Sequence, residues 1–497
     1  DSDRAMYLKL TGGGQACTVT LLPNTASKVW MLENATSYTL TFTCGSGANV
    51  AILAGETKII ATDGGGSGGI VYDVLTDVNL AGTTKVDDLT VGDDLVVGGD
   101  IDLAGSIDVD GTTETDVLTI NGSQLNYKAF GTSSIMFGDT TTGTISGANY
   151  NTGIGIDVFA ALTTGDENIA LGYSALNDLT TGSSNTAMGS TAGGKITTGG
   201  SNVALGADSL KNTTTASDNT AVGKSALTAN TSGTVNTAVG STALSANTTA
   251  ASNTAIGYGA LATATTGGLN TAVGRSALLD LTTGTPNVAV GAYAGQSVTT
   301  GASNTFIGYQ AGDATTTADG NTAVGRDSLV ANTTGASNTA VGGTALDANT
   351  TASFNTGLGY AALGANTTGA YNTAVGESTL VANTTASSNT AVGNFALGSN
   401  TTGATNTAVG RAALDANTTA SENTAVGYAS LGANTTGAKN TAVGRTAMET
   451  NTTGASNTAV GSDALTANTE GSSNTAFGQE AAKAITTGGE NVAIGHG

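Results

Sequence analysis

Residues 406–422 read N-T-A-V-G-R-A-A-L-D-A-N-T-T-A-S-E, and this 17-residue pattern recurs without insertion or deletion from Asn151 to Asn491. The consensus is N-T-A-V-G-x-x-A-L-x-A-N-T-T-G-A-S, and all 21 units have Asn at the first position and Gly at the fifth. A fixed period of this kind is the signature of a repeat architecture, in which each unit contacts its neighbours. What one unit can form therefore decides the fold of residues 151–497.

Each unit is predicted to form one coil of a β-solenoid. A unit of 17 residues is too short for a helix-turn-helix repeat, and T-A-V is a short alternating run typical of strands. Asn and Gly at fixed places are predicted at turns, because both tolerate positive φ, and stacked Asn side chains could also hydrogen-bond from coil to coil. At about 4.8 Å per coil, the stack would form a rod on the order of 100 Å long.

Two positions of the unit are predicted to point into the coil. Position four is aliphatic, Met or Phe in every unit, as in Ile154, Met188, Val222, Ile256 and Phe477. Position nine is usually Leu, as in Leu176, Leu227, Leu346 and Leu465. One coil buries too little apolar surface to be stable by itself, so stacking must supply the core.

Exchanges of volume within units support this packing. Where position nine is small, position twelve becomes aliphatic, as in the pairs Gly193 with Ile196, Gly295 with Val298, and Ala482 with Ile485. Close packing requires such compensation. The unit at Asn304 has Gly312 without that replacement, so we expect a thinner coil there.

Small residues form two further columns: position three is mostly Ala, and position eight is mostly Ala, Ser or Thr. These columns mark either the tight side of the coil or a seam between chains.

Position six is a possible surface contact ridge, carrying Tyr173, Tyr258, Arg275, Tyr309, Arg326, Tyr360, Arg411, Tyr428 and Arg445 together with Lys224. Tyr and Arg could contact glycans by stacking and hydrogen bonding; alternatively they cover the glycine turn and keep the rod soluble.

Residues 1–76 are predicted to form a small all-β domain, a sandwich or barrel. Its expected strands are 7–10, 18–22, 28–33, 38–43, 49–53, 57–61 and 70–75. Trp30 is expected in the core. Cys17 and Cys44 are either two buried free thiols or a disulfide.

Residues 77–125 have a second period of six, with Leu89, Leu95, Ile101 and Ile107 in one phase. Such short strands predict an acidic β stalk in which several identical chains share a core. Its carboxylates form either a solvated face or, less favoured, a Ca²⁺ site. Residues 126–150 are a transition, and Ser134–Gly138 already lies in the 17-residue register, so a degenerate first coil is expected there.

Composition and sequence motifs limit the classes of function that this chain is expected to have. The net charge of −22 makes nucleic acid an unexpected partner. The chain has no apolar run long enough for membrane insertion and no signal peptide at its start, and we expect it to be a segment of a longer polypeptide. Its one histidine is His496, so no catalytic, metal or cofactor site is predicted, and the protein is not expected to be an enzyme. The N-T-T triplets match the glycosylation pattern but are better explained as turn chemistry.

Two resemblances extend this interpretation. The units N-T-A-V-G-x-x-A-L, with the variants Asn168-Ile-Ala-Leu-Gly and Asn491-Val-Ala-Ile-Gly, resemble the head repeats of trimeric autotransporter adhesins, in which three left-handed β-rolls pack side by side. The unit here is a few residues longer than is common there. The segments 34–36, 45–50, 54–58 and 62–64 resemble a domain of tail fibres of marine tailed bacteriophages.

These resemblances imply a homotrimeric phage tail-fibre shaft that extends a receptor-binding end toward the host. Its location would be the virion, outside cells, with tail or adaptor proteins on the N-terminal side and a host surface glycan or protein as the receptor. The alternative is a secreted bacterial adhesin or filament on the cell surface. A fibre-borne polysaccharide depolymerase is least favoured.

Overall fold

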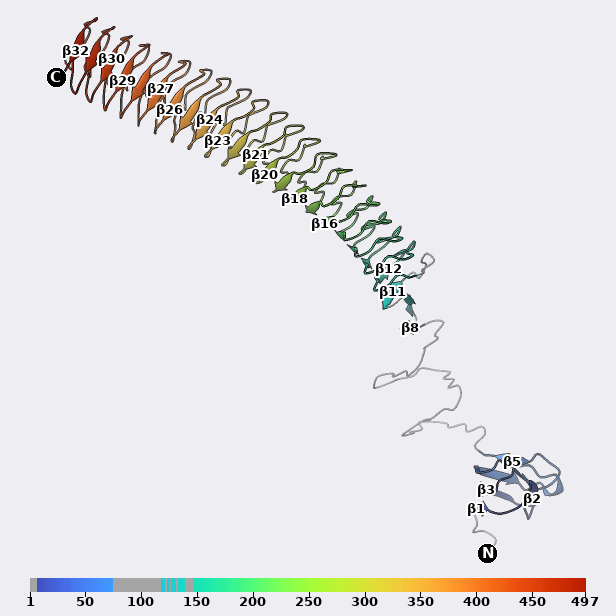
Figure 1. Cartoon of the computed structure of the whole chain (residues 1–497). Helices are drawn as coiled ribbons and strands as arrows, with labels where there is room; N and C mark the ends of the chain where they lie inside the picture. The colour runs from blue at the N-terminus through green and yellow to red at the C-terminus, as the bar shows by residue number, and fades with distance from the viewer. Residues whose placement is uncertain (1–6, 75–117, 121–122, 126, 131–132, 139–146) are drawn as a thin grey trace. The chain divides into compact units, whose positions relative to one another are not determined.

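The computed structural model of the chain describes residues 7–74, 118–120, 123–125, 127–130, 133–138 and 147–497. The described residues are all-β, apart from one 3-10 turn at Gly66–Gly68. Contacts divide the chain into two units, Asp1–Thr112 and Thr113–Gly497, which we describe separately (Figure 1). Most of the predicted acidic stalk, including its carboxylates, lies outside the described residues; its last part contains the paired strands β8 (Leu118–Ile120) and β9 (Ser123–Leu125).

The N-terminal unit consists of two sheets around a small core. Its strands are β1 (Tyr7–Leu10), β2 (Cys17–Thr20), β3 (Ser27–Asn34), β4 (Leu40–Thr43), β5 (Val50–Ile52), β6 (Thr57–Asp63) and β7 (Val71–Asp73). They form the sheets β1-β3-β6-β7 and β2-β4-β5. Leu32, Phe42, Ile52 and Ile60 lie buried between them, and Trp30 packs against this core partly buried. All seven predicted strands are confirmed, with ends shifted by a few residues.

Both cysteines are free, so the disulfide alternative is wrong. Cys44 is buried, and burial raises the pKa of its thiol, as does the nearby charge of Asp63. Cys17 is exposed, which corrects the prediction that both thiols are buried. The reason is that β2 is an edge strand of its sheet and most of its residues face solvent.

The long unit is a β-solenoid whose coils each contribute one short strand to a single sheet of 23 strands. It begins with β10 (Tyr127–Phe130), antiparallel to β11 (Ser134–Gly138). Parallel pairing then continues from β11 to β12 (Thr152–Gly155) and β13 (Ile169–Leu171), and onward from β14 (Thr186–Met188) to β32 (Val492–Ile494). Each strand from β13 on covers positions two to four of its unit. Figure 1 shows the coils stacked in a gently curved column.

The predicted register of a degenerate first coil is confirmed for its described strand, β11. Ile135 of β11 pairs with Thr152 of β12, and Gly138 pairs with Gly155, which is the same 17-residue offset that joins all later coils. Ser134 occupies the position of the repeat asparagine, and its hydroxyl accepts a hydrogen bond of 2.9 Å from the Asn151 amide.

The interior of the coil differs from the prediction at position four. Alternate residues of a strand point to opposite faces, and it is position three that points inward: Ala238 is fully buried, whereas Val239 is only half-buried. Leu244 at position nine is fully buried, as predicted. The prediction that position four points inward is therefore wrong. The chain segment that carries the position-nine Leu lies so close to the strand that the inward residue can only be small, and the small residue of the strand is the Ala at position three.

The small columns consequently mark the tight side of the coil and not a seam between chains. A Cβ added to Gly357 at position three would lie 3.4 Å from Cγ of Leu346 in the preceding coil. Residues at position eight are buried in the same interior, as with Ala243 and Ser328.

The coil at Asn304 is not thinner, which corrects a second prediction. Its position three holds Phe306, which is fully buried. A Cβ added to Gly312 would lie 2.5 Å from the Phe306 ring, and one added to Gly295 would lie 2.6 Å from it. The ring therefore fills the space that leucines at position nine would occupy in two successive coils.

Position five must be glycine for two independent reasons. Gly342 has φ of 136°, a conformation that residues with side chains rarely adopt. In addition, a Cβ there would lie 2.4 Å from the carbonyl oxygen of Gly359 in the next coil. Gly495, in the final coil, has no atom that close, so stacking itself creates the steric requirement.

The asparagines at position one form a ladder along the solenoid instead of positive-φ turns. The Asn355 amide donates to Oδ1 of Asn338 at 2.9 Å, and Nδ2 of Asn338 donates to the Ala352 carbonyl at 2.9 Å. Positive φ occurs instead at positions seven, nine and seventeen, as at Thr344, Leu346 and Ser337. The prediction of coil-to-coil asparagine bonds is confirmed, and that of positive φ at asparagine is wrong.

Position twelve holds a second, interrupted asparagine ladder. Nδ2 of Asn349 donates to Oδ1 of Asn332 at 2.9 Å, and this pattern continues coil by coil to Asn468. Oδ1 of Asn468 has no partner, since the next coil has Ile485 in its place. These asparagines are fully buried, which excludes the N-T-T triplets that begin at position twelve of folded coils as glycosylation sites.

Replacing Phe306 with Ala is expected to destabilise the solenoid by about 3–5 kcal/mol, because a cavity would span two coils. The free energy of unfolding from denaturant titration measures this. The second substitution Gly312→Leu in the Phe306→Ala chain should recover part of the loss. Phe354→Ala, at a 52 % exposed position, is the control and should cost far less; equal losses would contradict the packing described.

Replacing Asn338 with Ala should cost roughly 1–3 kcal/mol, because the buried Asn355 amide would lose its partner, whereas the Ala352 carbonyl would still accept a hydrogen bond from Nδ2 of Asn349. Hydrogen exchange at the Asn355 amide should accelerate with the loss of stability. Asn394→Ala, at a position where the amide only contacts Glu377 at the surface, is the comparison. An unchanged exchange rate at Asn355 would show that the ladder does not stabilise the stack.

Candidate interaction surfaces

The outer face of the long sheet carries an uninterrupted apolar column, which we call the position-four stripe: the outward side chains at position four from Ile154 to Ile494. Their exposure ranges from half-buried to exposed, for example Ile256 at 39 %, Leu358 at 45 % and Phe477 at 56 %. Because the strands are in register, each side chain lies directly above the next, about 4.8 Å apart.

This face contains no charge. Positions two and four, the two outward positions of each strand, hold only Thr, Val, Ile, Leu, Met or Phe in all 21 units, although the chain has 52 charged residues, 37 acidic and 15 basic. Open sheet faces and edges of soluble proteins are ordinarily protected by charged side chains. A long uncharged apolar surface is typical of a protein interface.

The predicted position-six residues lie together in one column. Tyr173, Tyr258, Tyr309, Tyr360 and Tyr428 are between 48 % and 61 % exposed. The Arg411 guanidinium lies 5.7 Å from the ring centre of Tyr428 in the next coil. The structure therefore groups these residues on the surface, across the glycine turn from the position-four stripe.

Position seven adds a residue that the sequence analysis missed. Tyr293 lies beneath the guanidinium of Arg275 at 5.4 Å, and its ring meets Tyr309 edge-on at 6.0 Å. The sequence signal that could have identified Tyr293 is its place directly after Ala292, a small residue at position six. Two stacked rings at position seventeen, Phe354 and Tyr371 at 5.1 Å, were also missed.

Two of the ridge arginines are held by carboxylates. Nε of Arg326 lies 2.7 Å from Asp327, and the resulting hydrogen bond raises the pKa of the Arg326 guanidinium. Nη2 of Arg445 lies 3.2 Å from Asp463, whose pKa is lowered by hydrogen bonds from Thr446 and Ser462 and by the nearby cations. All the groups involved stay near the surface, so these pairs position side chains and add little stability.

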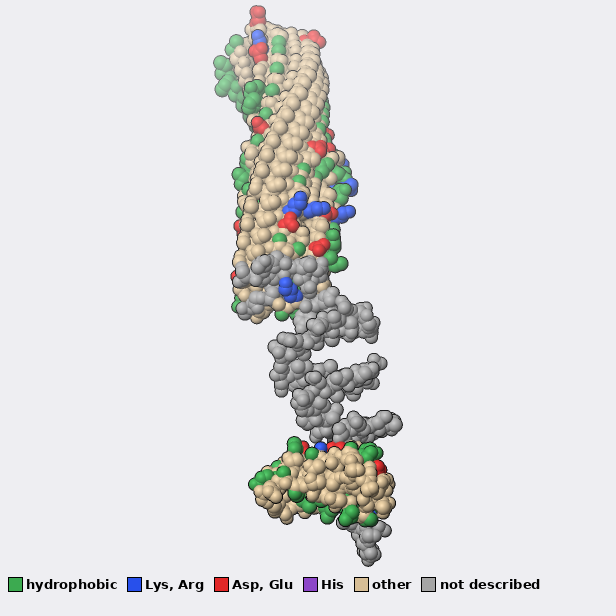
Figure 2. Space-filling view, turned by 90° about the vertical axis from the view of Figure 1, so that its right-hand side faces the viewer, with side chains coloured by type: hydrophobic (Ala, Val, Ile, Leu, Met, Phe, Trp, Pro, Cys, Tyr) green, Lys and Arg blue, Asp and Glu red, His purple; other side chains and the backbone are tan. Residues whose placement is uncertain are grey.

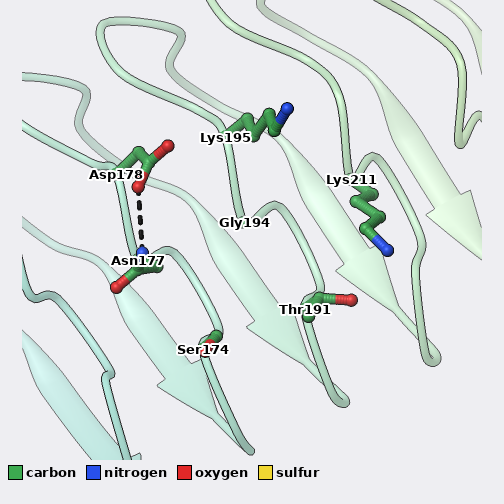
Figure 3. A pocket seen from close by; sticks show the side chains of 7 residues that line it. All are labelled: Ser174, Asn177, Asp178, Thr191, Gly194, Lys195 and Lys211. Atoms are coloured by element: carbon green, nitrogen blue, oxygen red, sulfur yellow. Dashed lines mark hydrogen bonds between the residues drawn. The ribbon is translucent and has the colours of Figure 1, made fainter.

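A shallow hollow opens near the start of the solenoid, where Gly194 takes the place of a larger side chain (Figure 3). It is lined by Ser174, Asn177, Asp178, Thr191, Gly194, Lys195 and Lys211. Asn177 Nδ2 donates to Asp178 at 2.9 Å, while Lys211 pairs with Asp208 at 2.8 Å. The hollow is therefore a polar depression that contains hydroxyl, amide, carboxylate and ammonium groups.

Three carboxylates at position ten are partly buried, and burial raises the pKa of Asp313, Asp347 and Asp415. They belong to coils at least two units apart, so they do not form the close carboxylate pair that a glycosidase requires. Within the described ranges, no group of three or more His, Cys, Asp or Glu side chains could hold a metal ion. The described part of the chain also contains no helix long and apolar enough to span a membrane.

Figure 2 shows one face of the molecule, on which hydrophobic side chains and a few charged ones lie along the solenoid among uncharged surface. Compared with known protein families, curated proteins and solved structures, the chain matches none. The two apolar and aromatic columns are therefore the features from which a function must be argued.

Replacing Val324, Val341 and Leu358 together with Glu is expected to leave each chain folded, because these side chains are at least partly exposed and strand propensities differ by only about 1 kcal/mol. If the stripe is an interface, the variant should dissociate to the 48.0 kDa chain at a higher protein concentration than the wild type, because three of the 21 stripe positions would carry a charge. The matched control is Thr334, Thr351 and Thr368 to Glu, which are exposed side chains on the same three coils. Equal assembly of both variants would show that the stripe is not an interface.

Proposed function

We propose that this chain is the shaft of a homotrimeric fibre, a tail fibre of a bacteriophage, and that it has no catalytic activity. The observation that supports the proposal is the position-four stripe, an apolar and uncharged face that runs the whole length of the described solenoid. A single copy would leave this face in water, at a cost that association removes.

A second copy of the same chain is the partner that fits best. The stripe repeats once per coil, and a rod with the same rise keeps its side chains in register along every coil. A partner with another spacing would lose register after a few coils. Closed cyclic symmetry, as in a trimer, buries the stripe of every copy and leaves none available for open-ended growth. The number three follows from the resemblance to trimeric adhesin heads.

The mechanism is mechanical: a rod of stacked coils provides reach and stiffness. Several copies would present their distal ends together, so that weak contacts with a host surface glycan or protein add up to avidity. Tail or adaptor proteins would bind on the N-terminal side, as the resemblance of residues 34–64 to tail-fibre domains implies. The repeat resemblance also supports a second candidate, a secreted bacterial adhesin or filament at the cell surface.

Native mass spectrometry of the purified chain tests the shaft proposal. We expect a particle with three times the 48.0 kDa mass of the chain, stable on dilution because the interface is long. A monomer at micromolar concentration would refute the proposal. A stable dimer would keep the stripe as an interface and overturn the trimer.

Virion and adhesin are distinguished by the polypeptide that carries this chain. A tail-docking domain upstream supports the phage fibre. A signal peptide upstream, or a membrane anchor downstream, supports the adhesin and overturns the phage fibre. Release of reducing ends from a bacterial polysaccharide by the purified protein would overturn the non-catalytic proposal.

A further inference from the structure

The position-six column differs in composition from the rest of the solenoid. All four arginines of residues 151–497 occupy it, namely Arg275, Arg326, Arg411 and Arg445. Five tyrosines and Lys224 share it, against a single carboxylate, Glu377. The whole chain has the opposite balance, with 37 acidic and 15 basic residues. If position six served only solubility, acidic residues would be expected there as well.

The densest part of the column, which we call the central ridge, extends from Tyr258 to Tyr360. Its planar groups follow one another coil by coil: Tyr258, Arg275, Tyr293, Tyr309, Arg326 and Tyr360. Ring contacts link its middle residues, since the Arg275 guanidinium lies 5.4 Å from the centre of the Tyr293 ring and that ring meets the Tyr309 ring edge-on at 6.0 Å.

The ridge continues across the coil of Gly343, which has no planar side chain at position six or seven. A Cβ added to Gly343 would lie 3.5 Å from the ring of Tyr360, so this ring leans back over the coil of Gly343. Planar groups therefore cover the coils from Asn253 to Asn355 without a break.

We propose that the central ridge binds an acidic linear polysaccharide lying along the solenoid axis. The exposed ring faces would stack on sugar rings, and the guanidinium groups of Arg275 and Arg326 would donate to carboxylate or sulfate groups of the polymer. Arg326 remains available for this because its side chain is 77 % exposed even while Nε bonds Asp327.

The periodicity of the ridge favours a repeating ligand. Successive coils are about 4.8 Å apart, which is comparable to the length of one hexose unit in an extended chain. A polymer of sugars can therefore repeat the same contact on several coils. The glycan site extends the proposed function and depends on it in one respect. The central ridge must stay outside the seam that the position-four stripe forms between chains.

Binding of polygalacturonate to the full chain in calcium-free buffer tests the proposal, with its methyl ester as the neutral counterpart and polyglutamate as an acidic polymer without sugar rings. We expect the ester and polyglutamate each to bind at least about 10-fold more weakly, because each lacks one of the two contact types. Equal binding of the ester would overturn the acidic specificity. Equal binding of polyglutamate would replace the polysaccharide with an acidic protein segment.

Matched variants locate the site. The double substitution Arg275→Gln with Arg326→Gln, and separately Tyr293→Ala with Tyr309→Ala, should each weaken polygalacturonate binding by about 10-fold or more. The controls are Arg445→Gln, on the same column but outside the central ridge, and Lys195→Gln, at the hollow of Figure 3. Wild-type affinity in both double variants, or no binding by the wild type, would overturn the inference.

The native mass of the same samples separates this inference from the shaft proposal. A trimer that does not bind polygalacturonate refutes only the glycan site. A monomer that binds it through the central ridge refutes the shaft and leaves the glycan site standing.

Discussion

The structure depends on one constraint: every coil must hydrogen-bond and pack against the next in a fixed offset of 17 residues. Backbone bonds such as Thr339 to Asn355 at 2.8 Å and Gly342 to Val324 at 2.8 Å join neighbouring coils. The position-one asparagine adds a side-chain bond to the backbone of the following coil. Because few of these groups have a partner within their own coil, a single coil has little structure without its neighbours.

The same constraint explains the unusual backbone. Residues at positions seven, nine and seventeen have positive φ in nearly every coil, including bulky ones such as Leu346 and Phe354, and Pro286 at position seventeen is an exception. Non-glycine residues in this region are strained by about 1–3 kcal/mol each when the conformation is unfavourable. The stack tolerates them because the Leu at position nine fills the coil interior, where its burial offsets the strain. In coil after coil, stacking thus outweighs the preference of non-glycine residues for negative φ.

The functional proposals follow from what stacking places on the surface. A strand of three residues with its middle residue inside has two residues outside, and identical units repeat those two residues along the whole rod. The apolar position-four stripe and the aromatic and cationic ridge at position six are both products of this repetition. When every unit has the same type of residue at one position, these residues together form a column along the rod that is long enough to bind a partner with a similar period.

The sequence by itself determined the solenoid, its coil boundaries, the leucine core at position nine, the seven N-terminal strands and the asparagine ladders, because a strict period links each residue type to one environment. Only the tertiary structure decided which side of the strand is inside. T-A-V alternates equally well in either orientation, and the close approach of the leucine segment, which leaves room for a methyl at position three, is a contact between residues distant along the unit. Phe306 at position three beside Gly312 was a sequence signal of that orientation, since a large residue there replaces core volume lost at position nine.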